Sequence, residues 1–506
     1  MSRRRASAWL VLGVWAAVLG WHVRREYFAP ESARLAAGAR TLAPGAHFYL
    51  IRLQGDVIGM AQVRLDTVPG GFRFDDELTL DVPALGRVHN TRTRTRLDLD
   101  SALTLRGFRF QLDSDIGRFD VSGEVRDSAL ELDLVAGGER QHSTLALEPD
   151  LLLGGMVPLR LAAGGALQVG ESHTWSVFDP SAMASRAVTL RVTGRETLVV
   201  PDSARLGADG TWQANVLDTV PVWRLEQSFG GVRVVSYVDE DGLMVREESP
   251  LGYTVERTYH QLAFQAWNAV RGASAPPPGY GAIIEGTAIA SNADLSDLAV
   301  RERLAVRLRG VELAGFDLEG GRQQLRGDTL LITRNRPRAA GYALPYAGGG
   351  GPAAELESTP LIQARDPRIT AAARAAVGDT RDPVEAARRL TDWVYGALEK
   401  DVTLSVPSAL QVLAARQGDC NEHTVLYVAL ARAIGLPART AVGLVHLGGT
   451  FYYHAWPEVW LGEWVAVDPT LGQYPADASH LRFLVGGLAR QVELIRLIGR
   501  LELEVL

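Results

Sequence analysis

Cys420 is the only cysteine in this chain of 506 residues, and its neighbours suit nucleophilic chemistry. The run Asp419-Cys420-Asn421-Glu422 has the pattern of a helix capping box, with Asp419 as N-cap and Glu422 three residues later. Cys420 then lies in the first turn of a helix, where free backbone N–H groups and the positive end of the helix dipole favour a thiolate. A buried cysteine that packs as a small hydrophobic residue is the alternative interpretation.

A histidine and an aspartate follow the cysteine on expected β-strands. Three strands are predicted downstream, with His454 in the second and Asp468 at the end of the third. If Leu461-Gly462-Glu463 forms the turn, Trp460 pairs with Trp464 and His454 is the diagonal neighbour of Asp468, about 7 Å away on one face. A two-residue turn would place the two side chains on opposite faces. In the first case the cysteine, histidine and carboxylate form an activated-nucleophile triad.

Short helices are expected before the cysteine. Asp366-Pro367 and Asp382-Pro383 each place an N-cap carboxylate before a proline at the first helical position. A third helix is predicted to start at Ser408 and to end at Gly418. These elements would pack against the helix that carries the cysteine.

Four ordered blocks of this region resemble motifs of the transglutaminase-like superfamily, of the bacterial, membrane-anchored type. The resemblance covers roughly residues 360 to 485, and the blocks are Gln417–His423, Gly435–Arg439, His454–Trp460 and Trp464–Thr470. It implies a papain-like α+β core with Cys420 as nucleophile, His454 as base and Asp468 as the residue that orients the histidine. It implies no cofactor and no metal ion.

In the implied mechanism the Cys420 thiolate, paired with protonated His454, attacks an amide carbonyl. Ammonia or an amine leaves with a proton from His454, and water or another amine resolves the thioester. The oxyanion needs two donors, for which the backbone N–H of Cys420 and the side chain of Gln417 are candidates. Gln417 is equally plausible as a surface residue that ends the preceding helix.

Other residues near the triad have weaker assignments. Trp456 could wall the cleft, although packing in the sheet is the default for it. His423 lies on the same helical face as Cys420 and is expected to have a structural or supporting role. His446 and His480 have no partner that the sequence identifies.

Three other functions compete with a cysteine hydrolase of peptide or other amide bonds. The first is transamidation, although Lys400 is the only lysine, so self-cross-linking through lysine is nearly excluded. The second is a mononuclear metal site made of Cys420, His423, His454 and Asp468. The third is a non-catalytic envelope protein whose β domains bind a partner while the core serves as a scaffold.

The rest of the chain predicts a multidomain protein that is rich in antiparallel β-structure. Residues 46–270 alternate apolar and polar side chains and are expected to form a barrel or a curved sheet. Asp241-Gly242 is a hairpin signal. On the run Thr91–Arg96, three arginines on one strand face are expected to pair with neighbouring acidic residues. The boundaries that we predict after this domain are a small β domain at 281–340, a glycine-rich linker at 341–359 and the transglutaminase-like domain at 360–506.

The N-terminus predicts a membrane anchor. Residues 6–23 are uncharged and long enough to span a bilayer as a helix, and they follow a cytoplasmic tail at 1–5 that contains three arginines. The residues that end the span, Trp21 to Arg25, are bulky and charged instead of small, so an uncleaved signal anchor is favoured over a signal peptide. A tether is expected at 24–45. The body of the chain would then lie in the periplasm, held at the inner membrane, with a protein or peptide substrate. The net charge of −7 gives no indication of a nucleic-acid partner.

Overall fold

The computed structural model describes residues 30–84, 87–114, 117–136, 139–148, 150–271, 288–337, 339–401 and 405–506. The predicted cytoplasmic tail and membrane anchor lie outside these residues, as do the first six residues of the tether. Among the helices in the described ranges, none combines the length and the apolar character that a bilayer crossing requires.

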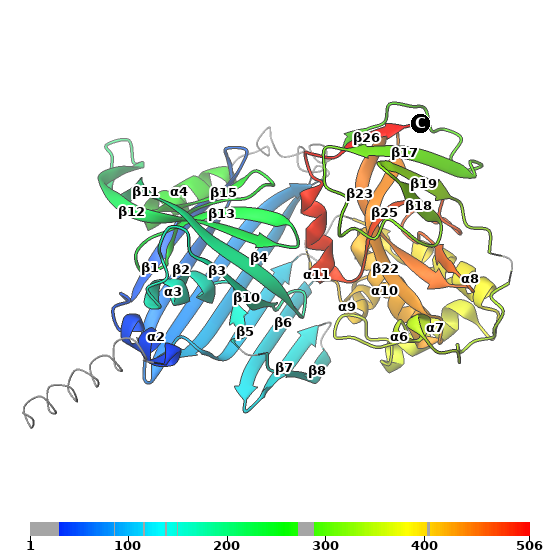
Figure 1. Ribbon diagram of the computed structural model, residues 1–506, viewed down its shortest axis with the longest axis horizontal. Helices are drawn as coiled ribbons and strands as arrows, with labels where there is room; N and C mark the ends of the chain where they lie inside the picture. The colour runs from blue at the N-terminus through cyan, green and yellow to red at the C-terminus, as the bar shows by residue number, and fades with distance from the viewer. Residues whose placement is uncertain are drawn as a thin grey trace, which may run out of the picture.

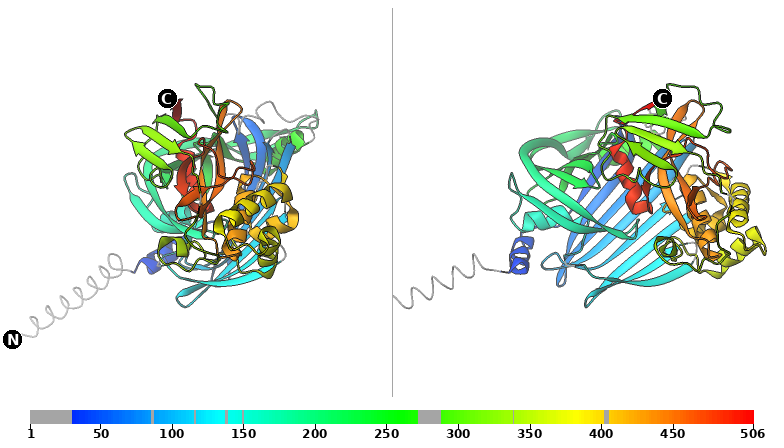
Figure 2. Two further views of the ribbon diagram at one scale, coloured as in Figure 1. Left: turned by 90° about the vertical axis from the view of Figure 1, so that its right-hand side faces the viewer. Right: turned by 45° about the vertical axis from the view of Figure 1, so that its right-hand side comes forward.

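The N-terminal half forms one sheet of fifteen strands, which Figures 1 and 2 show as a strongly curved layer. The order is β8-β7-β6-β5-β4-β3-β2-β1-β15-β14-β13-β12-β11-β10-β9, so two meanders meet where β1 pairs with β15. Because β8 and β9 are not paired with each other, the sheet is open rather than a closed barrel. The strand bounds are β1 (Gly45–Leu53), β2 (Asp56–Val68), β3 (Gly71–Ala84), β4 (Arg87–Asp100), β5 (Leu105–Ser114), β6 (Gly117–Arg126), β7 (Ala129–Ala136), β8 (Glu139–Ala146), β9 (Leu152–Leu153), β10 (Ser172–Asp179), β11 (Ala184–Leu206), β12 (Trp212–Phe229), β13 (Val232–Val238), β14 (Met244–Glu248) and β15 (Tyr253–Thr258).

Period-two alternation explains how this sheet forms its core. Along β7 every second residue is buried, and these leucines join a large apolar cluster with α2 (Glu31–Ala39) and α3 (Met156–Ala163). Helix α4 (His260–Arg271) packs on β1 and β2 through Trp267. The predicted hairpin at Asp241-Gly242 is confirmed by the pairing of β13 with β14. The predicted pairing of the arginine run is also confirmed, because ion pairs join Arg92 and Arg94 to Glu77 and Arg96 to Asp75.

The C-terminal half packs helices against a second sheet, drawn in yellow to red in Figure 1. The sheet has the order β16-β23-β22-β25, with β24 added on β23, and α10 lies against β22 and β23. The first strand of this sheet comes from the region expected to be a separate small domain. The bounds are β16 (Ile289–Ala290), α6 (Gly351–Ala354), α7 (Pro367–Val377), α8 (Pro383–Ala397), β20 (Glu399–Lys400), α9 (Ala409–Ala415), β21 (Gln417–Gly418), α10 (Cys420–Ala433), β22 (Ala438–Leu447), β23 (Thr450–Trp460), β24 (Trp464–Ala466), β25 (Leu481–Val485), α11 (Leu488–Gln491) and a 3₁₀ helix η1 (Val492–Arg496).

A third, small sheet connects the two regions that were expected to be separate, residues 281–340 and 360–506. It contains β17 (Arg303–Arg309), β18 (Gln323–Arg326), β19 (Thr329–Thr333) and β26 (Glu502–Val505), and β26 pairs with β17. Apolar side chains of this sheet and of the central sheet belong to one buried cluster, which includes Val306, Leu444 and Phe483. The small sheet and the core therefore share their hydrophobic interior.

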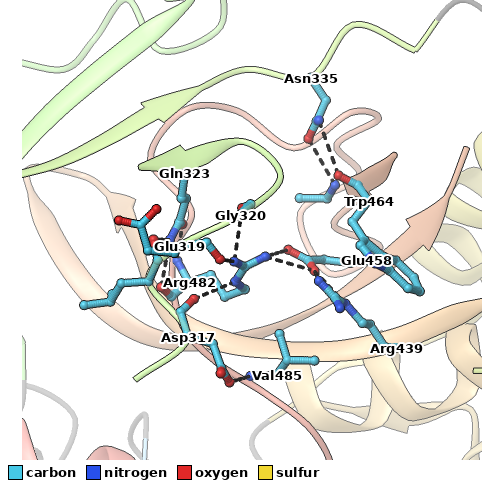
Figure 3. Close-up of polar contacts among 12 residues, drawn as sticks. Asp317, Glu319, Gly320, Gln323, Asn335, Arg439, Glu458, Trp464, Arg482 and Val485 are labelled. Atoms are coloured by element: carbon cyan, nitrogen blue, oxygen red, sulfur yellow. Dashed lines mark hydrogen bonds and ion pairs between the residues drawn. The ribbon is translucent and has the colours of Figure 1, made fainter. Parts of the chain in front are cut away.

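Buried charges reinforce this junction (Figure 3). Glu458 on β23 accepts hydrogen bonds from Arg482 at 3.0 Å and from Arg439 at 2.6 Å, and the side chain of Glu458 is only 1% exposed. Arg482 also donates to the backbone carbonyl groups of Asp317, Glu319 and Gly320, at 3.0, 2.8 and 3.2 Å. One guanidinium group thus joins the loop before β18 to the central sheet.

The core also contacts the large sheet directly. Val406, just before α9, is buried in the same apolar cluster as the strands of the large sheet. A second contact is made by the turn between β12 and β13. There Gly230 and Gly231 lie against the side chains of Glu493 and Arg496 of η1. The cysteine-bearing region is therefore packed on the large sheet.

Candidate active site

Helix α10 begins as the sequence predicts. The Asp419 carboxylate accepts a hydrogen bond from the amide of Asn421 at 2.8 Å, and Glu422 accepts one from the amide of Asp419 at 3.0 Å. Gly418 makes room for this capping box, because a Cβ atom there would lie 2.2 Å from Cβ of Glu422. Cys420 is the first residue of the helix.

The helix before it ends earlier than expected. Helix α9 stops at Ala415, and Arg416 takes the left-handed conformation at φ 57°. The backbone amide of Arg416 donates a hydrogen bond to the carbonyl group of Val412. The prediction that Gly418 ends this helix was therefore wrong. Gly418 instead belongs to β21, which pairs in parallel with β20 just before the capping box. The helices predicted at Asp366-Pro367 and Asp382-Pro383 are confirmed, each with its aspartate as N-cap.

Strands β22, β23 and β24 bring the histidine to the aspartate. Trp460 pairs with Trp464, which confirms the predicted three-residue turn and the register that follows from it. His454 therefore reaches Asp468, and Nε2 of His454 lies 2.7 Å from Oδ2 of Asp468. Both side chains are buried, and Asp468 has no exposed surface.

The Asp468 carboxylate is built to stay ionised. Oδ1 accepts hydrogen bonds from the backbone amides of Thr470 and Leu471 at 2.8 and 2.9 Å. Burial opposes ionisation, but the charges and hydrogen bonds of His454 and His480 outweigh it and hold the pKa of Asp468 well below its usual range. Because Nε2 of His454 donates to this carboxylate, Nδ1 is the nitrogen left for proton exchange.

The thiol lies beside the histidine strand, but it is not acidified in the way that the helix position predicts. The backbone amide of Ala455, the residue after His454, lies near the Cys420 sulfur and acts to lower the pKa of the thiol. Cys420 keeps some exposed surface, yet burial raises the pKa of its thiol, and the neighbouring Asp419 carboxylate raises it further. The expectation of a lowered thiol pKa was wrong, because burial disfavours the thiolate and the N-cap that starts the helix is itself an anion.

A second histidine, which the sequence did not connect to the site, meets the same aspartate. Nε2 of His480 lies 2.9 Å from Oδ2 of Asp468, and Nδ1 lies 3.2 Å from Oδ1 of Asp477. His480 is fully buried, and its ring packs edge-on against Trp456 at 5.1 Å between centroids. The one local signal for this position is Asp477, whose carboxylate accepts from the amide and hydroxyl of Ser479 in a tight turn.

The supporting residues predicted around the triad are placed as follows. The Gln417 side chain donates to Asp401 at 2.8 Å, so one of its amide hydrogens is already used. His423 is buried, and its Nδ1 lies 2.7 Å from the carbonyl oxygen of Asp419. Trp456 is 1% exposed and stacks on His454 at 6.1 Å between centroids, so it packs beneath the histidines rather than lining an open cleft.

The four residues predicted as alternative metal ligands do not come together as one group. Within the described ranges, the ligand atoms that gather are those of His454, Asp468 and His480, all within 4.8 Å of one another, and neither Cys420 nor His423 belongs to this group. Both histidine nitrogens lie at hydrogen-bond distance from one carboxylate oxygen. We therefore assign the group as a hydrogen-bonded network.

The fold and this network combine a cysteine at a helix N-terminus with a histidine on an adjacent strand that is hydrogen-bonded to a buried carboxylate. Residues 370–469 match the family model of the transglutaminase-like superfamily, so this segment is a transglutaminase-like core. The match includes Cys420, His454 and Asp468, whereas His480 lies beyond it. A comparison with curated proteins finds no significant match.

Solved structures with partial similarity include three bacterial proteins. A candidate cysteine protease from Cytophaga hutchinsonii is 15% identical, covering 40% of this chain and 81% of its own, with a TM-score of 0.26. The periplasmic domain of TgpA from Pseudomonas aeruginosa is 17% identical, covering 35% and 74%, with a TM-score of 0.25. A β-barrel-like protein of the DUF1849 domain from Brucella abortus is 14% identical, covering 43% and 95%, with a TM-score of 0.32.

Proposed function

We propose that this protein is a cysteine-dependent acyl-transfer enzyme that hydrolyses peptide or other amide bonds through a thioester on Cys420. The observation that carries the proposal is the 2.7 Å hydrogen bond between His454 and Asp468. The backbone amide of Ala455, the next residue on the strand, lies near the Cys420 sulfur. This arrangement supplies a nucleophile, a base and a residue that orients the base.

The geometry suggests the order of proton transfers. Nδ1 of His454 takes the thiol proton, and the resulting imidazolium stabilises the thiolate, which the buried thiol alone does not favour. The sulfur attacks the carbonyl carbon, and the backbone N–H of Cys420 is a donor for the oxyanion. The same histidine then protonates the leaving amine, and water resolves the thioester with His454 as base.

We further propose that the protein is held at the inner membrane by residues 6–23, with its body in the periplasm. The support is the sequence itself, an uncharged span behind three arginines. The large sheet would then lie between the anchor and the core and could present envelope peptides to Cys420. Protease protection of the full chain in spheroplasts tests the orientation, and digestion of the body only after the inner membrane is opened would contradict it.

The test of catalysis uses the full chain with a library of peptide amides. We expect product formation in the unaltered protein and a loss of at least about 10³-fold for Cys420→Ala, because the thioester cannot form. Asp392→Asn, an exposed change on α8, serves as the control. Addition of a labelled amine separates the two acyl-transfer reactions, since incorporated amine indicates transamidation and free acid indicates hydrolysis. If a folded protein forms no product from any substrate and Cys420→Ala keeps the cellular phenotype, the scaffold interpretation replaces ours.

A further inference from the structure

Both ring nitrogens of His480 face carboxylate oxygens. One lies 2.9 Å from Asp468 and the other 3.2 Å from Asp477, and the ring has no contact with solvent. An ionised carboxylate only accepts hydrogen bonds, so a neutral imidazole, which has one N–H, could satisfy one of these two contacts but not both.

Both carboxylates are held in the ionised form by other donors. Asp468 accepts from two backbone amides on its other oxygen. Asp477 accepts from the amide and hydroxyl of Ser479 at 2.8 and 2.7 Å and from the side chain of Gln473 at 3.0 Å. Protonating either carboxyl group would weaken these contacts, so the shared proton belongs to the ring.

We propose that His480 is a positioning residue that is held as an imidazolium between Asp468 and Asp477, and that its charge offsets the negative charge that Asp468 presents to His454 and Cys420. This inference rests on the proposed function only in so far as it concerns the reactivity of the thiol. His480 and His454 share one oxygen, Oδ2 of Asp468, and their rings are 6.0 Å apart. The cation therefore offsets the negative charge that His454 would otherwise receive from Asp468.

The other groups packed around His480 and its two carboxylates include one charged side chain, Arg322, and one uncharged ring, Trp456. Arg322 donates to the backbone carbonyl groups of Ala476 and Asp477, and its charge also interacts with the Asp477 carboxylate. Trp456, which packs on the ring, carries no charge. The pKa of His480 is raised because its hydrogen bonds and the charges of the two carboxylates outweigh the burial that would lower it.

Alkylation of Cys420 tests the proposal without a known substrate, because the chain has no other cysteine. The rate constant with iodoacetamide is measured from pH 5 to pH 10 for the unaltered protein and for His480→Gln, His480→Lys and the exposed control His142→Gln. Loss of the cation leaves the Asp468 charge uncompensated and is expected to raise the pKa of the thiol, so the rate profile of His480→Gln moves to higher pH by about one unit. His480→Lys, which restores a cation, moves it back toward the unaltered profile, and His142→Gln leaves it unchanged.

The outcomes separate the two proposals. An unshifted profile for a folded His480→Gln protein, or equal displacement by Gln and Lys, would show that the ring serves packing alone and overturn the inference. If the variants do not fold, the ¹⁵N signals of the His480 ring in the unaltered protein, assigned through its contact with Trp456, decide. Two protonated nitrogens at pH 8 support the inference, and a neutral ring contradicts it. An inert thiol in the unaltered protein instead counts against the proposed enzyme, whatever the state of His480.

Discussion

At the scale of single residues, the reactivity of Cys420 is a balance between its position and its neighbours. The first turn of α10 favours a thiolate, whereas burial and the Asp419 carboxylate favour the thiol. Burial and the Asp419 charge therefore favour the neutral thiol, and in the proposed mechanism His454 activates it.

Replacing Asp419 with asparagine should make Cys420 react faster. Asparagine caps helices as well as aspartate does, so the helix remains while the negative charge is removed. We expect the alkylation rate at pH 7 to rise by about 3- to 10-fold, because the thiol pKa falls. Asp382→Asn, the same change at the N-cap of α8, should leave the rate unaltered. An equal or lower rate for a folded Asp419→Asn protein would contradict the electrostatic account.

The buried carboxylates predict how stability depends on pH. The folded state lowers the pKa values of Asp468 and Asp477, so their contribution is fully present above about pH 4 and is lost as the pH falls. The pKa of His480 is raised, so its contribution is lost at the opposite end, as the pH rises through that raised value. Urea unfolding between pH 2.5 and pH 7 should show a loss on the order of 1–3 kcal/mol on the acid side. Asp477→Asn should reduce that slope, whereas Asp392→Asn should not.

At the scale of elements, close approach of backbones decides where the network forms. Gly443 on β22 pairs with His454 on one side, and a Cβ atom there would lie 1.9 Å from the carbonyl oxygen of Leu481 on the other. The ladder between β22 and β25 shifts register at this glycine. A glycine therefore lets β25 lie close enough to bring the preceding His480 to Asp468.

Substitution Gly443→Ala should push β25 away and disturb the active site. We expect a loss of about 1–3 kcal/mol in the free energy of unfolding, as for other overpacked sites, together with altered alkylation of Cys420. The control is Gly396→Ala in α8, where a Cβ atom meets no neighbour within 4 Å and alanine favours the helix. Denaturant unfolding of both variants measures the difference, and equal stability of the two proteins would contradict the steric argument.

At the scale of the whole molecule, the three larger sheets are joined by shared apolar clusters and buried charges. The small sheet shares apolar side chains with the central sheet, β26 completes it from the far end of the chain, and Val406 inserts into the interior of the large sheet. The buried Arg482–Glu458 pair joins the loop before β18 to the strand that carries His454. The small sheet is therefore linked to the strand that carries His454.

Replacing Arg482 with methionine should be strongly destabilising. It leaves Glu458 hydrogen-bonded to Arg439 alone among the described arginines and removes the donor from three backbone carbonyl groups. We expect a loss of about 3–5 kcal/mol, as for other buried pairs with one partner removed. Arg301→Met, at an exposed pair with Asp297, should cost less than about 1 kcal/mol. Chemical denaturation compares the two, and a small effect at Arg482 would show that the junction depends on its apolar contacts alone.

Local chemistry in the sequence determined much of this protein: the capping box around Cys420, the aspartate–proline helix starts, the hairpin at Asp241-Gly242 and the turn that makes His454 a diagonal neighbour of Asp468. Each depends on residues a few positions apart, whose hydrogen bonds are local. Tertiary structure alone decided the rest. His480 reaches Asp468 because β25 pairs with β22, β26 joins a strand almost two hundred residues earlier, and the fifteen strands stay open because of their long-range order. Such pairings are selected by the packing of the whole interior, which no single segment encodes.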